Sequence, residues 1–144
     1  MTGVVADTHA LIWYLLEDSR LSRQACAAFD AATAANQKIY LPTICIVEAT
    51  YLVEKKRIAE GVLICLEQVF EGDDSPFELF DLTPEVARAV RKIPRSSVPD
   101  MPDRIIAATS SFMTIPQRAT LRSRHARPDY CGYGPLVEFA TGHP

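Results

Sequence analysis

Short β-rich segments alternate with amphipathic helical stretches along this chain, and no other feature of the sequence constrains its fold as strongly. The segments with the composition of strands are residues 3–6, 38–41 and 77–81. Helical stretches separate them, and strands that alternate with helices are typical of a parallel sheet covered by helices. The sequence therefore predicts an α/β fold.

Six helices are predicted around these strands, at residues 10–17, 22–35, 43–56, 58–70, 83–93 and 100–112. Thr43 is expected to cap the third helix with its side chain. The spacing of apolar residues predicts which face of this third helix is buried. The residues expected on that face include Ile44, Val47, Tyr51 and Leu52.

The length and the charge distribution bear on domain organisation and on the kind of substrate. With 144 residues, the chain is expected to form a single domain over residues 1–144. Its net charge is −3, but residues 1–90 carry 7 basic and 14 acidic side chains, whereas residues 91–144 carry 8 basic and 4 acidic ones. This asymmetry suits a polyanionic substrate held beside a cation site, and solvated faces of opposite sign are the alternative.

Several classes of protein and of site lack support in the sequence. The longest apolar run, residues 58–70, is shorter than the roughly 18–20 residues that span a bilayer. The N-terminus lacks the basic region of a secretory signal, so a cytoplasmic protein without membrane contact is expected. The four cysteines stand far apart, which argues against a zinc site, and Cys26, Cys45 and Cys65 are interpreted as buried, reduced residues.

Four acidic residues stand where an α/β fold concentrates its binding chemistry. Asp7 follows the first strand, at the edge of the sheet where ligands bind. Glu48 lies inside an apolar helical segment, where a carboxylate is costly unless it is paired, protonated or bound to a cation. Asp100 and Asp103 open the last predicted helix. Converging carboxylates raise one another's pKa unless a cation neutralises them, and Mg²⁺ or Mn²⁺ suits such an all-oxygen site.

Each of these acids also has a purely structural interpretation. Asp7 is a possible N-cap of the helix that follows it. The two acids that open the last helix are a possible N-cap and a first-turn acid favoured by the helix dipole. Glu48 is a possible partner of Lys55 or Arg104.

Three segments of the chain carry a more specific signal than any single acid. They are Asp7-Thr8-His9-Ala10-Leu11-Ile12-Trp13, Ile46-Val47-Glu48 and Asp100-Met101-Pro102-Asp103-Arg104-Ile105-Ile106-Ala107-Ala108-Thr109. In this order and at this distance they resemble the three leading motifs of PIN-domain ribonucleases, specifically the VapC toxins of bacterial type II toxin–antitoxin systems.

This resemblance implies a three-layer α/β/α sandwich with a central parallel sheet. It implies a Mg²⁺- or Mn²⁺-dependent endoribonuclease that acts as a toxin on RNA, is inhibited by a cognate VapB-type antitoxin and forms a homodimer. By motif matching, Asp7, Glu48 and Asp103 correspond to the family's catalytic, metal-binding acids. Asp100 corresponds to an additional metal-binding acid, and Thr8 to the hydroxyl residue after the first acid.

The C-terminal tail departs from the family. Residues 1–112 match it, whereas residues 113–144 diverge and contain no Asp or Glu between Ile115 and His125, so the family's fourth acid is not found. Asp129 is a weak substitute, and Arg104 and the arginines between residues 118 and 127 are candidates for phosphate contacts. Two hypotheses stay open: a frameshift produced this tail, or the chain is a degenerate domain that binds antitoxin or RNA without cleavage.

Overall fold

The protein is built around a parallel sheet of three strands. The computed structural model describes residues 3–114, with the strands β1 (Gly3–Val5), β2 (Lys38–Pro42) and β3 (Phe77–Phe80). Their order is β1-β2-β3, so that Gly3 lies opposite Lys38, and Ile39 lies opposite Phe77. Both pairings are parallel, which confirms the α/β fold expected from the sequence.

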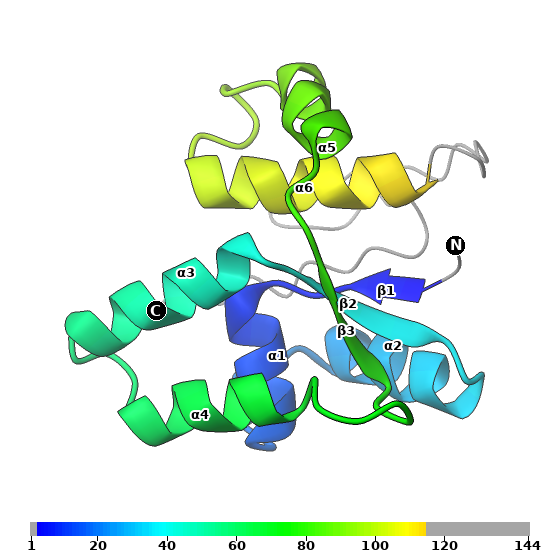
Figure 1. The fold of residues 1–144 in the computed structure, drawn as a ribbon, viewed down its shortest axis with the longest axis vertical. Helices are drawn as coiled ribbons and strands as arrows, with labels where there is room; N and C mark the ends of the chain where they lie inside the picture. Colours follow the sequence, from blue (N-terminus) through cyan, green and yellow to red (C-terminus); the bar gives the residue numbers. More distant parts are fainter. Residues whose placement is uncertain (1–2, 115–144) are drawn as a thin grey trace.

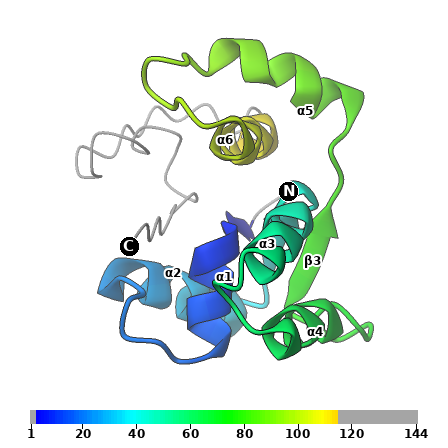
Figure 2. The ribbon, with the colours of Figure 1, turned by 90° about the vertical axis from the view of Figure 1, so that its left-hand side faces the viewer.

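Helices cover both faces of this sheet. The helices of residues 3–114 are α1 (Thr8–Leu15), α2 (Arg23–Ala34), α3 (Ile44–Glu54), α4 (Glu60–Gln68), α5 (Pro84–Ala89) and α6 (Met101–Thr114), with a 3₁₀ helix η1 (Val90–Lys92) after α5. Figures 1 and 2 show α1 and α2 on one side of the sheet and α5 and α6 on the other, with α3 and α4 projecting beyond its end. This arrangement confirms the three layers of the expected sandwich.

Two apolar clusters hold the layers together. The first joins α1, α2 and the sheet to α6, and it includes Phe29, Ile39 and Ile106, each at most 1% exposed. The second joins α5 to α6 and includes Val86 and Ala108. Because α6 contributes to both clusters, this helix is fixed against the sheet as well as against α5.

Local capping signals place three of the helix starts. Asp7, Ser22 and Thr83 each accept a hydrogen bond from the backbone three residues ahead, as N-cap residues do. Thr43 was expected to do the same for α3, and that prediction is wrong. Its backbone is already helical, and its hydroxyl accepts a hydrogen bond from the Leu82 N–H at 3.3 Å instead. The hydroxyl thus ties the start of α3 to the segment after β3.

The buried face of α3 also differs from the prediction. Val47 and Tyr51 were expected in the core, but they are 63% and 55% exposed, whereas Cys45 and Ala49 are buried. The helix is apolar on most of its circumference, so spacing alone does not distinguish the face that packs from the face that stays in solvent. The expectation of buried cysteines fails similarly at Cys65, which is exposed on α4.

The close approach of β1 and β2 leads to a stability prediction. A Cβ atom on Gly3 would lie 2.5 Å from the Lys38 carbonyl oxygen and 2.6 Å from Tyr40 Cε2. Gly3→Ala is therefore expected to lower the free energy of unfolding by about 1–3 kcal/mol, measured by urea denaturation. Gly61→Ala in α4 is the control, because its Cβ meets nothing within 4 Å and alanine favours a helix by about 0.5–1 kcal/mol. Equal effects of both changes would contradict this reading of the β1–β2 contact.

Several sequence predictions lie outside the described residues. These are the substitute acid Asp129, Cys131, and the arginines between residues 118 and 127. The single domain over 1–144 stays a prediction for the same reason. Within residues 3–114, none of the helices has both the length and the apolar character that a bilayer crossing requires.

Candidate active site

Asp7 stands where the chain leaves the sheet. The Ala6 N–H still donates to the Tyr40 carbonyl at 2.8 Å, so pairing with β2 continues up to the residue before Asp7. Asp7 then takes an extended conformation and caps α1, its Oδ1 accepting a hydrogen bond from the Ala10 N–H at 2.7 Å. The carboxylate is only 5% exposed. Its structural role as a cap is therefore real, and it coexists with a buried position at the carboxyl end of β1.

Glu48 is brought to the same place by α3, which follows the end of β2 as α1 follows the end of β1. The Thr8 hydroxyl donates to Glu48 Oε1 at 3.1 Å, across a sequence separation of 40 residues. This hydroxyl also lies 3.5 Å from the Cys45 carbonyl oxygen. Because a threonine hydroxyl has a single proton and the contact with Glu48 is shorter, Thr8 orients the Glu48 carboxyl group.

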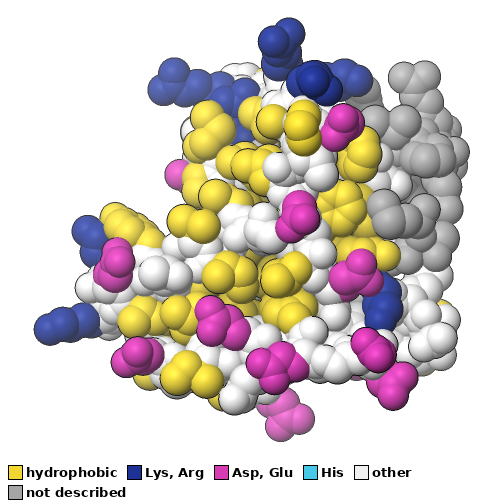
Figure 3. Space-filling model, viewed as in Figure 1, with side chains coloured by type: hydrophobic (Ala, Val, Ile, Leu, Met, Phe, Trp, Pro, Cys, Tyr) yellow, Lys and Arg dark blue, Asp and Glu magenta, His cyan; other side chains and the backbone are white. Residues whose placement is uncertain are grey.

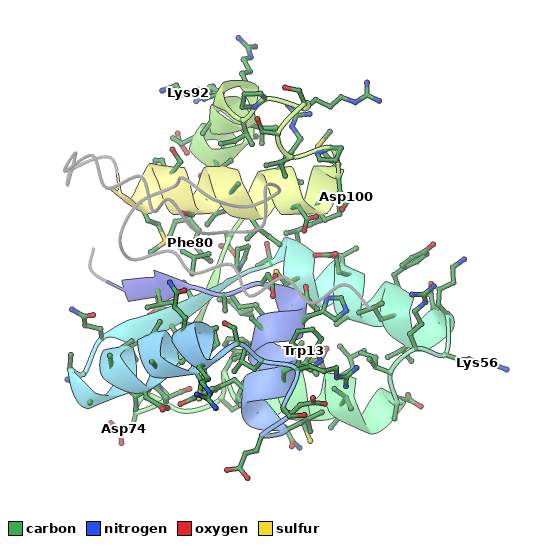
Figure 4. All side chains as sticks on the ribbon, turned by 180° about the vertical axis from the view of Figure 1, so that it is seen from behind. Trp13, Lys56, Asp74, Phe80, Lys92 and Asp100 are labelled. Atoms are coloured by element: carbon green, nitrogen blue, oxygen red, sulfur yellow. The ribbon has the colours of Figure 1, made fainter. Side chains whose placement is uncertain are left out.

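Asp103 completes a group of three carboxylates, which we call the acid cluster: Asp7, Glu48 and Asp103. It lies in the first turn of α6 and is 9% exposed. Its charge acts on both other members of the acid cluster. Asp100 acts on Glu48 but is itself exposed, at the start of α6 on the side of α3, where Figure 4 labels it. The structure therefore brings together the three acids expected to be catalytic and places the fourth at their edge.

Burial and mutual repulsion disfavour ionisation of the acid cluster. Burial raises the pKa of Asp7 from 3.8 to about 8; the Ala10 N–H opposes this shift, and the charges of Asp103 and Glu48 add to it. Burial likewise raises the pKa of Glu48 from 4.5 to about 7, opposed by the Thr8 hydroxyl and reinforced by Asp103 and Asp100. Buried and half-buried acids with such pKa values are typical of a functional site.

The donor chemistry of the acid cluster fits a hard divalent cation. All its donors are carboxylate oxygens, the class of ligand that Mg²⁺ and Mn²⁺ prefer, and positive charge would remove the repulsion described above. Within residues 3–114, however, no three His, Cys, Asp or Glu side chains stand close enough to bind one ion in their present conformations. The residues therefore fit such an ion by chemical type, and their side chains would have to close around it.

Arg104 and Lys55 have contacts other than those expected. Arg104 was a candidate for pairing with Glu48 or for binding phosphate, but its guanidinium donates to the Ile93 and Val90 carbonyl oxygens at 3.2 and 3.3 Å. It thus ties the end of η1 to the start of α6. The Lys55 ammonium, the other expected partner of Glu48, lies 5.2 Å from the ring centroid of Tyr51.

Sequence reasoning missed a cleft that begins at the acid cluster. It has a volume of about 570 Å³, is lined by α1, α3 and α4, and has Glu48 in its wall. Tyr51, Lys55 and Arg57 also line it. Tyr51 was assigned to the core, Lys55 was considered only as a partner of Glu48, and Arg57 was counted only in the charge balance.

Basic side chains also gather at the far end of the α5 layer. Figure 3 shows Lys and Arg atoms over this end of the molecule. The exposed basic residues of this segment are Arg88, Arg91, Lys92 and Arg95. The charge asymmetry of the sequence thus has a spatial counterpart, and its two interpretations, a polyanion-binding surface and a solvated face, both stay open.

Comparisons with known proteins agree with this architecture. The family model for the PIN domain matches residues 4–115, which is most of the chain. Ribonuclease VapC22 of Mycobacterium tuberculosis (strain ATCC 25618 / H37Rv) is 33% identical over 134 residues, an alignment that covers 89% of this chain and 97% of that protein. Both matches together place the chain in the PIN-domain family, among the VapC-type ribonucleases.

Proposed function

We propose that this protein is the toxin of a toxin–antitoxin pair and a Mg²⁺- or Mn²⁺-dependent endoribonuclease that hydrolyses RNA phosphodiester bonds. The observation that carries this proposal is the acid cluster, in which two buried carboxylates and the half-buried Glu48, each from a separate segment, interact electrostatically at the edge of the sheet. The partners that follow from family membership are an RNA substrate and a cognate VapB-type antitoxin. A homodimer in the cytoplasm is part of the same proposal.

Asp7, Glu48 and Asp103 would hold the cation, and the negative charge of Asp100, which acts on Glu48, would add to the attraction for that cation. A bound Mg²⁺ or Mn²⁺ lowers the pKa of water and offsets negative charge on the attacked phosphodiester. The buried carboxylates of the chain would otherwise repel the RNA backbone. Binding of this substrate by the acid cluster therefore depends on positive charge held within it.

Hydrogen bonds within the protein hold two of these carboxylates in position. Asp7 is anchored by the Ala10 N–H, so one of its carboxylate oxygens is fixed before any ligand binds. Glu48 is oriented by the hydrogen bond from the Thr8 hydroxyl, so one of its carboxylate oxygens is likewise held in place before any ligand binds. Thr8 is 1% exposed, so the donor of this hydrogen bond is buried while Glu48 reaches the wall of the cleft.

Glu48→Gln provides the test of this proposal. The change keeps the shape of the side chain but removes its charge, and RNA cleavage with Mg²⁺ or Mn²⁺ is expected to fall by at least about 100-fold. The measurement is the initial rate on a labelled RNA with purified, antitoxin-free protein, repeated with EDTA, which is expected to stop cleavage. Glu54→Gln is the control, because Glu54 ends the same helix and is exposed.

The outcomes separate the proposal from its alternatives. Equal cleavage by wild type, Glu48→Gln and Glu54→Gln would indicate a contaminating nuclease and remove the assignment of the acid cluster. No cleavage by folded wild-type protein, with cation present, would support the alternative of a degenerate PIN domain that binds antitoxin or RNA without cutting it.

A further inference from the structure

The cleft beside the acid cluster has walls of mixed character. Its lining carries three basic side chains, those of Arg20, Lys55 and Arg57, against the single carboxylate of Glu48. Its remaining surface is largely apolar, from α1, α3 and α4. A space that combines net positive charge with apolar area suits a ligand that has both phosphates and flat, weakly polar bases.

One wall of the cleft presents acid, aromatic ring and cation in sequence. Glu48, Tyr51 and Lys55 are spaced i, i+3 and i+7 on α3, so they share one face of the helix. The distance from Glu48 to Lys55 along the helix axis is about 10 Å, at 1.5 Å per residue. Arg57 follows where the chain turns toward α4, and all four residues line the cleft. We call Tyr51, Lys55 and Arg57 the α3 row.

The side chains of the α3 row are exposed, unlike residues that pack in the core. Tyr51 is 55% exposed, and Lys55 and Arg57 are exposed as well. The Lys55 ammonium lies 5.2 Å from the Tyr51 ring centroid, which arranges cation and ring side by side on the surface. Tyr51 belongs to neither apolar cluster and lines the cleft, so its ring is accessible to a ligand there.

The opposite wall of the cleft carries one cation, Arg20, and a carboxylate already pairs with it. The Arg20 guanidinium lies 5.1 Å from the centroid of the Trp13 ring, and it is paired with Asp18 at 2.7 Å. Trp13 itself is 5% exposed, so its ring forms a wall of the cleft and offers little face to a ligand. Among the described residues that line the cleft, the exposed ring and the Lys and Arg side chains without a paired carboxylate are therefore those of the α3 row.

We propose that the α3 row binds the single-stranded RNA next to the scissile phosphate. One base stacks on Tyr51, and the phosphates beyond it contact Lys55 and Arg57. This inference rests on the proposed function, because it places the RNA nucleotides next to the cleavage site along this wall of the cleft. Stacking on an aromatic ring beside cations is how proteins bind single strands with little dependence on base identity. A partner protein segment in the same cleft is the competing occupant.

The test measures RNA affinity in protein that cannot cut the probe. In an Asp7→Asn background, binding of a labelled single-stranded RNA oligonucleotide is followed by fluorescence anisotropy at several salt concentrations. Lys55→Gln combined with Arg57→Gln is expected to weaken binding by about 10-fold or more. It should also reduce the slope of log Kd against log salt by about 1.4, because each lost phosphate contact removes about 0.7 for a single strand.

The role of Tyr51 is tested separately, because loss of its ring should lower the RNA affinity without changing the salt dependence. Tyr51→Ala is expected to weaken binding by about 10-fold and to leave the salt slope unchanged, whereas Tyr51→Phe retains the stacking ring and should bind like the parent. Arg23→Gln is the control, because Arg23 is an exposed basic residue on α2 that does not line the cleft. Its loss should change the affinity and the slope much less than the loss of the two cations.

Parental affinity and salt slope in the α3 row variants would overturn the inference. If these variants also lost binding to the cognate antitoxin, the cleft would be assigned to the protein partner. Cleavage by wild type together with unchanged RNA binding by the variants would leave the proposed function intact and remove only this inference. Wild type that neither cleaves nor binds the oligonucleotide would remove both.

Discussion

Asp7→Asn is expected to abolish RNA cleavage, lowering kcat by at least about 100-fold, while making the cation-free protein more stable. The two effects have one cause. Asp7 is buried with its pKa raised to about 8, so its charge is unfavourable in the folded protein unless a cation offsets it. Asparagine has no charge to bury, and its side-chain oxygen still accepts the hydrogen bond from the Ala10 N–H. Removal of a functional carboxylate thus relieves repulsion and retains the cap.

Two further variants isolate the capping role of Asp7. Asp7→Ala removes the charge and the cap together, so it should be less stable than Asp7→Asn by about 1 kcal/mol. Ser22→Ala removes the matching cap of α2, where the Ser22 hydroxyl accepts a hydrogen bond from the Ala25 N–H at 3.0 Å. It should lose similar stability and keep full cleavage. Urea denaturation and cleavage rates measure both properties. Wild-type cleavage by Asp7→Asn would contradict the role given to this residue.

The elements around the acid cluster were predictable because their signals are local. Asp7 stands between a short apolar strand and a helix. Aspartate is a typical N-cap residue, so its presence there indicates the boundary, and in the structure it caps the helix. The start of α5 at Thr83-Pro84 is equally local, and the structure confirms it. Each of these signals depends on neighbours within a few residues, so no tertiary contact is needed to interpret it.

The contacts between these elements could not be predicted in the same way. The hydrogen bond from Thr8 to Glu48 joins residues 40 apart, and it exists only because α1 and α3 follow adjacent parallel strands. The direction of Tyr51 depends on which side of an almost uniformly apolar helix packs inward. Arginine is a common phosphate-binding residue, but the guanidinium of Arg104 donates its hydrogen bonds to the carbonyl oxygens of Val90 and Ile93. The positions of the helices and strands along the chain were therefore easier to predict than the directions in which individual side chains point.

The same logic explains why the setting of Glu48 in the sequence already marks it as a candidate, whereas the contacts of Arg104 could not be predicted. A carboxylate inside an apolar segment needs compensation wherever the fold places it, so its residue type and setting already carry information. A guanidinium has several donors and can be satisfied by any nearby carbonyl oxygens. Sequence spacing does not indicate which of these acceptors the fold will bring within reach.

The pH dependence of stability is expected to change sign when a divalent cation is added. In EDTA, Asp7 and Glu48 have pKa values of about 8 and 7 in the folded protein against ordinary values of 3.8 and 4.5. Below about pH 3 these groups are protonated in both folded and unfolded states and contribute no difference. As the pH rises, the unfolded chain releases these protons first, so the folded state is progressively disfavoured until the pH passes the folded pKa values.

The comparison with Asp7→Asn isolates this effect from the other carboxylates. Wild type and variant should have equal free energies of unfolding near pH 3, and wild type should become less stable than the variant as the pH rises toward 8. The difference should grow by at most about 1.4 kcal/mol per pH unit for this group. Urea denaturation across this pH range in EDTA provides the measurement. Parallel curves for the two proteins would show that the Asp7 carboxylate is not a buried, repelled group.

Addition of Mn²⁺ should reverse the trend in wild type and in any variant that keeps the carboxylates of the acid cluster. A cation that competes with protons for the same carboxylates binds more tightly at pH 8 than at pH 6, and it stabilises the folded state by RT ln(1 + [L]/Kd). At a concentration 100 times Kd this amounts to about 2.7 kcal/mol, seen as a rise in Tm. Asp7→Asn should gain far less, because it lacks one ligand of the acid cluster, whereas Ser22→Ala should gain as much as wild type. An equal gain in Asp7→Asn would place Mn²⁺ binding elsewhere on the protein, and the metal-dependent chemistry proposed for the acid cluster would fail with it.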